Sequence, residues 1–181
     1  MPWQLDPMHT QVEFSVKHFQ MMTVRGRFND VKATGTVDPA DPKRSRLDVE
    51  IAVASLNTHN AQRDDDLRGS YFLEIDKHPT ITFKSTAVTS LGGDNYALDG
   101  DLTIKGITNP VSLQVHRLGE VTHDQMGHRI GYAAQTEINR KDFGMRFDAV
   151  RDGRFIVSNE VQINIEGEVV EVKEQAEAVN A

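Results

Sequence analysis

Regular alternation of apolar and polar residues runs through most of this chain and constrains its fold more than any other feature. In the stretch DGDLTIKGITNPVSLQVHR, residues 99–117, two alternating runs flank a turn that contains Gly106, Asn109 and Pro110. Successive side chains of a β-strand point to opposite faces, so each run predicts a strand with one apolar face and one polar face. The two runs and the turn together predict a β-hairpin.

The same alternation recurs along the rest of the chain, separated by turns rich in Gly, Pro, Asp and Asn. Each clear run keeps only one apolar face, which is typical of an antiparallel sheet with one solvated side. An apolar share of 38% also argues against a continuously hydrophobic parallel sheet. About eight strands are expected, roughly the number that closes a barrel. The sequence therefore predicts an all-β fold, an eight-stranded antiparallel barrel with one or two short helices; further runs lie at 12–16, 47–53, 81–83, 96–98, 132–138 and 155–169.

One segment, 57–79, breaks the alternation. It starts with Asn and Thr, continues with good helix formers and reaches Gly69 at a plausible helix end, so we expect a short helix near 60–68. A second short turn of helix is expected at 18–22. We assign residues 1–170 to one barrel domain and residues 171–181 to a polar C-terminal tail.

Candidate catalytic and metal-binding groups are sparse. The chain has no cysteine, and His123, Asp124 and His128 lie in an expected loop without the spacing of a helical zinc pair. Asp64, Asp65 and Asp66 point about 100° apart on a helix, so we interpret them as a solvated face. The sequence contains no nucleophile elbow, phosphate-binding loop or dinucleotide fingerprint. We therefore predict no metal site, no cofactor and no enzymatic activity.

Charge and hydropathy narrow the class of partner and the compartment. The formal net charge of -7 disfavours a nucleic acid partner. The longest apolar stretches are far shorter than a membrane-spanning helix requires. The N-terminus has no basic start followed by an apolar run, so the chain as given is expected to stay in the cytoplasm. The sequence leaves open whether the chain acts as a monomer or as a homodimer.

Four segments in chain order resemble the YceI family. They are DPMHTQVEFSVKHF with VRGRF, DDDLRGSYFLEIDKHPTITFKS, GDLTIKGITNPVSLQV and NRKDFGM, and the resemblance extends from about residue 3 to residue 169. It implies a lipocalin-like antiparallel barrel that binds a long isoprenoid lipid in its interior. It also implies that many relatives are exported to the periplasm, although this chain shows no signal. It transfers no catalytic residue.

The inward-facing residues are the candidate ligand contacts. A polar substrate would need several inward donors and acceptors, whereas these positions are mostly Val, Ile, Leu and Phe. An alkyl chain needs no such groups, because each buried CH2 contributes about 0.8 kcal/mol. The expected contacts are Phe14, Val16, Val49, Ile51, Phe83, Leu102, Ile104, Leu113, Val115 and Phe143.

Two polar residues are candidates for contacting the head group of a lipid. His18 continues the inward parity of the first strand, and its alternative role is a histidine satisfied by a neighbouring backbone group. Arg140 could hold a phosphate or carboxylate, and its alternative role is an ion pair with Asp142 or another carboxylate. Two other functions stay open. One is an enzyme acting on a small apolar substrate within the barrel, and the other is a packed barrel that acts as an interaction module.

Overall fold

Ten antiparallel strands form one sheet in the computed structural model, which describes residues 3–151 and 154–172. Along the sheet the strands follow the order β3-β4-β6-β7-β8-β9-β12-β1-β2-β5, and β10 and β11 form a separate two-stranded sheet. The strands are β1 Trp3–His18, β2 Met22–Phe28, β3 Val31–Thr36, β4 Arg46–Ala52, β5 Leu56–Asn57, β6 Thr80–Gly92, β7 Asn95–Ile104, β8 Ile107–His123, β9 Gly127–Asn139, β10 Val150–Arg151, β11 Arg154–Phe155 and β12 Glu160–Glu171.

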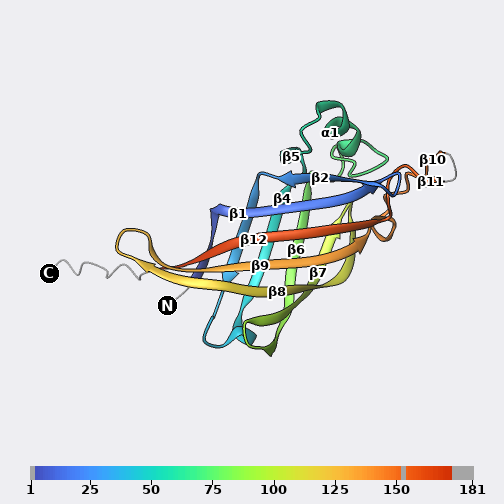
Figure 1. Cartoon of the computed structure of the whole chain (residues 1–181). Helices are drawn as coiled ribbons and strands as arrows, with labels where there is room; N and C mark the ends of the chain where they lie inside the picture. Colours follow the sequence, from blue (N-terminus) through green and yellow to red (C-terminus); the bar gives the residue numbers. More distant parts are fainter. Residues whose placement is uncertain (1–2, 152–153, 173–181) are drawn as a thin grey trace.

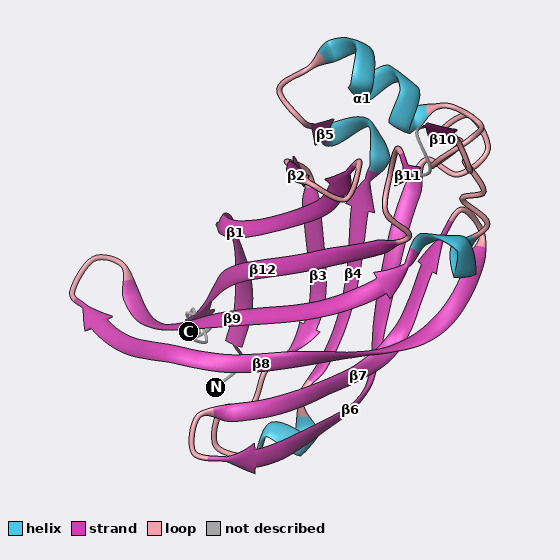
Figure 2. Cartoon of the chain, turned by 45° about the vertical axis from the view of Figure 1, so that its right-hand side comes forward, coloured by secondary structure: helices cyan, strands magenta, loops and turns pink. Residues whose placement is uncertain are grey.

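The sheet curls around an interior, as Figures 1 and 2 show. The first part of β1 pairs with β12, and a bridge between Trp3 and Val37 brings its other edge to the end of β3. The predicted antiparallel barrel is confirmed, but the predicted strand number of eight is too low. One reason is that β5 contains only two residues, so alternation could not reveal it.

The predicted helix near 60–68 is confirmed as α1, Ala61–Arg68. The side chain of Asn60 accepts a hydrogen bond from the backbone N–H of Arg63, which caps the start of the helix. Three 3-10 helices accompany it: η1 Pro42–Arg44, η2 Val53–Ser55 and η3 Arg140–Phe143.

The predicted turn of helix at 18–22 is wrong. Strand β1 continues to His18 and β2 begins at Met22, so only a tight turn lies between them. Phe19 and Gln20 adopt left-handed backbone angles, with φ of 49° and 59°, which reverse the chain between paired strands.

The turn between β7 and β8 is shorter than predicted. Lys105 and Gly106 alone form it. Both residues have a positive φ, which the favoured two-residue hairpin turn requires at its two central positions. Asn109 and Pro110 therefore lie within β8. Proline is tolerated there because β9 pairs with β8 only from Gln114 onward, which leaves that edge of β8 open.

Buried apolar residues gather in two clusters at opposite ends of the barrel. The larger cluster includes Val53, Leu56 and Phe143 near the α1 end, with 1%, 3% and 2% of their surfaces exposed. The smaller cluster contains Trp3, Ile130 and Val169, where β1, β9 and β12 meet at the other end. The interior between them is only partly filled by side chains.

Strand β12 continues to Glu171, one residue past the predicted domain boundary, and the division into a barrel domain and a tail stays a prediction. Most of the predicted polar tail, 173–181, lies outside the described residues. Among the helices that the structure describes, none has the length and apolar character needed to cross a membrane.

Candidate functional site

A cavity of about 660 Å³ occupies the interior of the barrel. Its wall is built from the inward-facing residues of β1, β4, β6, β7, β8, β9 and β12. The predicted inward orientation of these residues is confirmed, because a strand in the correct register turns its whole apolar set to one side. The cavity is lined by Phe14, Val16, Val49, Ile51, Phe83, Leu102, Ile104, Leu113 and Val115, together with Ile163 and Ile165.

Two glycines let aromatic rings lie against this wall. A Cβ atom on Gly26 would collide with the ring of Phe14, and a Cβ atom on Gly100 would collide with the ring of Phe83. Glycine inside a strand often marks such a close approach. Each ring therefore occupies the space above a glycine, which leaves more of the interior open. The sequence contained this signal, a glycine interrupting an alternating run, but its role could not be read without the register.

His18 lies at the rim of the cavity, at the end of β1. Its side chain is exposed and its ring packs edge-on against Phe19, with 4.4 Å between ring centroids. Its backbone forms an isolated bridge to Val157. The structure thus places this imidazole at an opening near the α1 end and leaves it accessible from outside.

Arg140 lies close to the same rim but is only 2% exposed. Its guanidinium donates three hydrogen bonds to backbone carbonyls: Nε to Ser158 at 3.0 Å, Nη1 to Met145 at 2.8 Å and Nη2 to Phe147 at 2.6 Å. Burial lowers the pKa of Arg140, while the carboxylate of Asp148, 4.0 Å away, acts in the opposite direction. Backbone carbonyls hold this side chain in place, and the carboxylate nearest to it is Asp148 rather than Asp142, in line with its alternative role as an ion-pair partner of another carboxylate.

Phe143 lies in η3 and packs inside the larger apolar cluster. It is outside the lining of the cavity. The side chain of Asn139 caps the start of η3, and Gly144 ends it with a positive φ of 73°. These local signals turn the chain so that Phe143 faces the core and Arg140 faces the carbonyls of the following loop.

The interpretation of the three aspartates as a solvated face is wrong for Asp64. Its side chain is only 8% exposed, and Oδ1 accepts hydrogen bonds from Thr58 N at 2.9 Å and from Thr58 Oγ1 at 2.5 Å. Arg63 donates from Nε to the same hydroxyl at 2.8 Å. Position in the first turn of α1 points Asp64 back at the preceding loop, whereas Asp65 and Asp66 are exposed.

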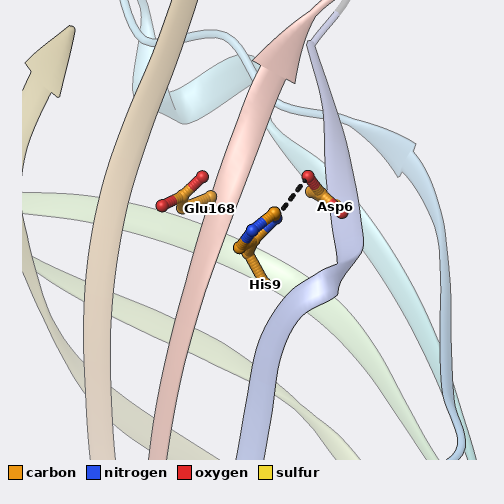
Figure 3. Close-up of side chains that lie close together, drawn as sticks. All are labelled: Asp6, His9 and Glu168. Atoms are coloured by element: carbon orange, nitrogen blue, oxygen red, sulfur yellow. Dashed lines mark hydrogen bonds and ion pairs between the residues drawn. The ribbon is translucent and has the colours of Figure 1, made fainter. Parts of the chain in front are cut away.

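One group of side chains has the composition of a metal site. Ligand atoms of Asp6, His9 and Glu168 lie within 4.8 Å of one another, outside the lining of the cavity (Figure 3). Nη1 of Arg129, however, lies 2.6 Å from Asp6 Oδ2 and 2.8 Å from Glu168 Oε2. The two carboxylates therefore already share the positive charge of one guanidinium.

The pKa of Asp6 reflects this environment. Burial raises it, but hydrogen bonds from Arg129 and His9 outweigh burial and hold the pKa at about 2. Such an ion-pair network explains the arrangement without a metal ion.

The loop histidines do not converge on one point. Nδ1 of His123 accepts from the backbone N–H groups of Gln125 and Met126. His128 packs against the ring of Trp3 at 4.8 Å between centroids and lies 3.3 Å from a carboxylate oxygen of Glu120. Both histidines thus have structural partners of their own.

Comparisons with known proteins agree with this architecture. The YceI-like domain profile matches residues 3–169. The UPF0312 protein of Pseudomonas paraeruginosa is 36% identical over 140 residues, which cover 77% of this chain and 73% of the relative. BcnA of Burkholderia cenocepacia has a similar crystal structure, with a TM-score of 0.80 and 25% identity over 93% of this chain and 100% of that chain.

A more distant fold neighbour is a polyisoprenoid binding domain from Saccharophagus degradans. It has a TM-score of 0.68 and 16% identity, and the match covers 95% of this chain and 99% of that domain. The fold is therefore shared even where the sequences have diverged. On the profile match across residues 3–169 and the identity to the Pseudomonas relative, the chain belongs to the YceI-like domain family.

Proposed function

We propose that the barrel binds a long isoprenoid or a similar apolar lipid chain and carries or stores it away from water. The observation that supports this function best is the apolar cavity of about 660 Å³. Ligand pockets of roughly 300–1,000 Å³ lined by hydrophobic side chains are typical of small-molecule sites. The Saccharophagus domain of similar fold, a polyisoprenoid binding domain, adds support.

The affinity of such a site comes from burial of apolar surface. About 0.8 kcal/mol per CH2 over ~20 carbons gives roughly 16 kcal/mol before the costs of ordering the chain. We propose that the chain lies along the wall formed by Phe14, Val49, Phe83 and Leu113, with Val16, Ile51, Leu102, Ile104 and Val115 beside it. Shape and length then provide the affinity without a sequence motif.

The sequence predicts that the polar head group of the lipid lies near His18 and Arg140, and this position of the head group stays a prediction. The exposed imidazole of His18 is accessible to a ligand at the rim. Arg140 already donates three hydrogen bonds to backbone carbonyls. Its contribution at this end is therefore to hold the loop around Met145 and Phe147, both of which line the cavity.

The two alternatives have less support. An enzyme would need acid, base or nucleophilic groups close together. His18 with Arg140 is the pair that the sequence offers, and Arg140 already donates three hydrogen bonds to backbone carbonyls. A fully packed interaction module is disfavoured by the size of the cavity. We therefore favour a binding protein over both.

Native mass spectrometry of protein purified from its own host, followed by lipid extraction, tests this function. We expect one apolar lipid per barrel, and we expect the delipidated protein to take up an isoprenoid of similar length. Protein that arrives empty and takes up no isoprenoid after delipidation would contradict the proposal.

A further inference from the structure

Two tyrosines lie at the end of the cavity away from α1. Tyr96 of β7 and Tyr132 of β9 both line the cavity. Strand β8 lies between them, with Val115 paired to Tyr96 and Arg117 paired to Tyr132. Residues that pair across an antiparallel ladder share a face of the sheet. The two phenol rings therefore enter the same end of the interior from two different strands.

The hydroxyls of these tyrosines are available for a ligand. Among the described residues, neither hydroxyl makes a hydrogen bond. Neither hydroxyl is among the buried polar atoms that lack a hydrogen-bond partner. Burial raises the pKa of Tyr132, and the nearby Tyr96 raises it further while Arg117 lowers it. Tyr132 is therefore a neutral O–H donor at neutral pH. A tyrosine hydroxyl in an apolar setting usually has a partner, which here a bound molecule can supply.

The cations near this end already have partners. Arg46, which lines the cavity, donates from Nη1 to the carbonyl oxygens of Lys43 and Ser45. Nη2 of Arg117 lies 2.6 Å from a carboxylate oxygen of Glu120, which pairs its charge, while its Nε is buried without a hydrogen-bond partner among the described residues. Arg117 is also outside the cavity lining. A phosphate or carboxylate would need an unpaired cation or several directed donors. A neutral oxygen needs only a hydroxyl donor such as the two tyrosines offer.

Resting on the proposed function, we propose that Tyr96 and Tyr132 bind the polar end of the lipid. We further infer that this end carries a neutral oxygen, an alcohol or a carbonyl, rather than a phosphate or carboxylate. The apolar tail then extends toward the α1 end, where Phe72, Leu73 and Met145 line the cavity. This orientation is the reverse of a head group placed at His18.

Calorimetric titration of the delipidated full chain tests the inference with three C20 probes. The probes are geranylgeraniol, geranylgeranyl diphosphate and the same hydrocarbon chain with hydrogen in place of the hydroxyl. We expect the alcohol to bind more tightly than the hydrocarbon by about 3- to 10-fold, the range of one or two neutral hydrogen bonds. We expect the diphosphate to bind more weakly than the alcohol.

The double variant Tyr96→Phe with Tyr132→Phe removes both hydroxyls and keeps both rings. The ratio of the alcohol and hydrocarbon affinities should fall to about one. Tyr71→Phe is the matched control, because Tyr71 is 71% exposed and outside the cavity lining. It should keep the ratio of the parent protein. His18→Ala distinguishes the two possible head-group positions, because a preference for the alcohol that depends on His18 would contradict the tyrosine site.

The outcomes separate this inference from the proposed function. If the alcohol and the hydrocarbon bind equally to the parent protein, the tyrosine site is wrong but lipid binding stands. The inference is also overturned if the diphosphate binds most tightly, or if His18→Ala rather than the tyrosine double variant removes the preference. If none of the three probes binds, the proposed function itself fails.

Discussion

The packed cap at the α1 end and the open section of the barrel use the same strands but fill the interior differently. In the packed cap, Val53, Phe143 and Arg140 are 1%, 2% and 2% exposed. In the open section, Val49 and Phe83 are only half-buried because they face the cavity.

The difference shows which elements close the interior. The cap receives side chains from the 3-10 helices η2 and η3 in addition to the strands. The open section receives most of its side chains from strands, with Phe72, Leu73 and Met145 of the irregular segments at its α1 end, and the Phe83 ring lies back over Gly100. Strand alternation therefore builds the wall, while the irregular segments between strands decide how much of it is filled.

The largest expected effect is on stability in the packed cap. Phe143→Ala should lower the free energy of unfolding by about 3–5 kcal/mol, because it leaves a cavity among well-packed neighbours. Urea denaturation monitored by circular dichroism measures this. A loss below about 1 kcal/mol would show that the cap is as loosely filled as the open section.

Arg140→Leu should have the next largest effect. Losing the guanidinium leaves three carbonyl acceptors without their donor, and each unsatisfied buried group costs about 1–3 kcal/mol. Partial access of water to the loop reduces this, so we expect a total loss of roughly 3 kcal/mol. His18→Ala, at the exposed rim nearby, should change stability by less than about 0.5 kcal/mol. Equal losses for both variants would contradict the structural role of Arg140.

A smaller effect is expected at the opposite end, where Asp6 pairs with Arg129. The pKa of Asp6 falls to about 2 in the folded state from 3.8. The contribution of this carboxylate to stability is therefore present above pH ~4 and is lost as the pH falls toward 2. We expect a loss on the order of 1 kcal/mol after solvent screening.

Acid unfolding of Asp6→Asn checks this expectation. The variant should be less stable than the parent protein at pH 7 and should show a flatter stability profile between pH 4 and pH 2. Asp76→Asn, at an exposed position, serves as the control and should follow the parent profile. An Asp6→Asn profile that matches the parent at every pH would show that the ion pair contributes nothing.

The alternation predicted the barrel and the wall of the cavity because both depend on side-chain parity alone. Gly69 similarly marked the end of α1 with local chemistry, whereas the cap at its start, Asn60, became clear from the structure. The turn at Phe19 and Gln20 could not be predicted, since left-handed angles at non-glycine residues have no compositional signal. Strand β5 was missed because two residues cannot display a period.

The candidate site was only partly predictable for a related reason. The inward direction of Val49 or Leu113 follows from parity, but whether the space in front of them is filled depends on distant segments. The burial of Asp64 required the position of Thr58, and the carbonyl partners of Arg140 come from a loop without regular pattern. Tyr96 and Tyr132 became candidates only when the register of β7, β8 and β9 placed them at one end.

The same substitution in both regions tests most directly the claim that the barrel contains an open, lipid-binding section. Val49→Trp adds volume to the cavity wall, so it should lower the unfolding free energy of lipid-free protein by less than about 1 kcal/mol, whereas uptake of an isoprenoid should drop sharply. Val53→Trp, in the packed cap, should cost about 1–3 kcal/mol or more.

Both variants are measured after delipidation, because bound lipid itself raises apparent stability. The account predicts that Val49→Trp melts within a few degrees of the parent protein and no longer takes up isoprenoid. A Val49→Trp protein that melts much earlier and still takes up lipid normally would contradict it.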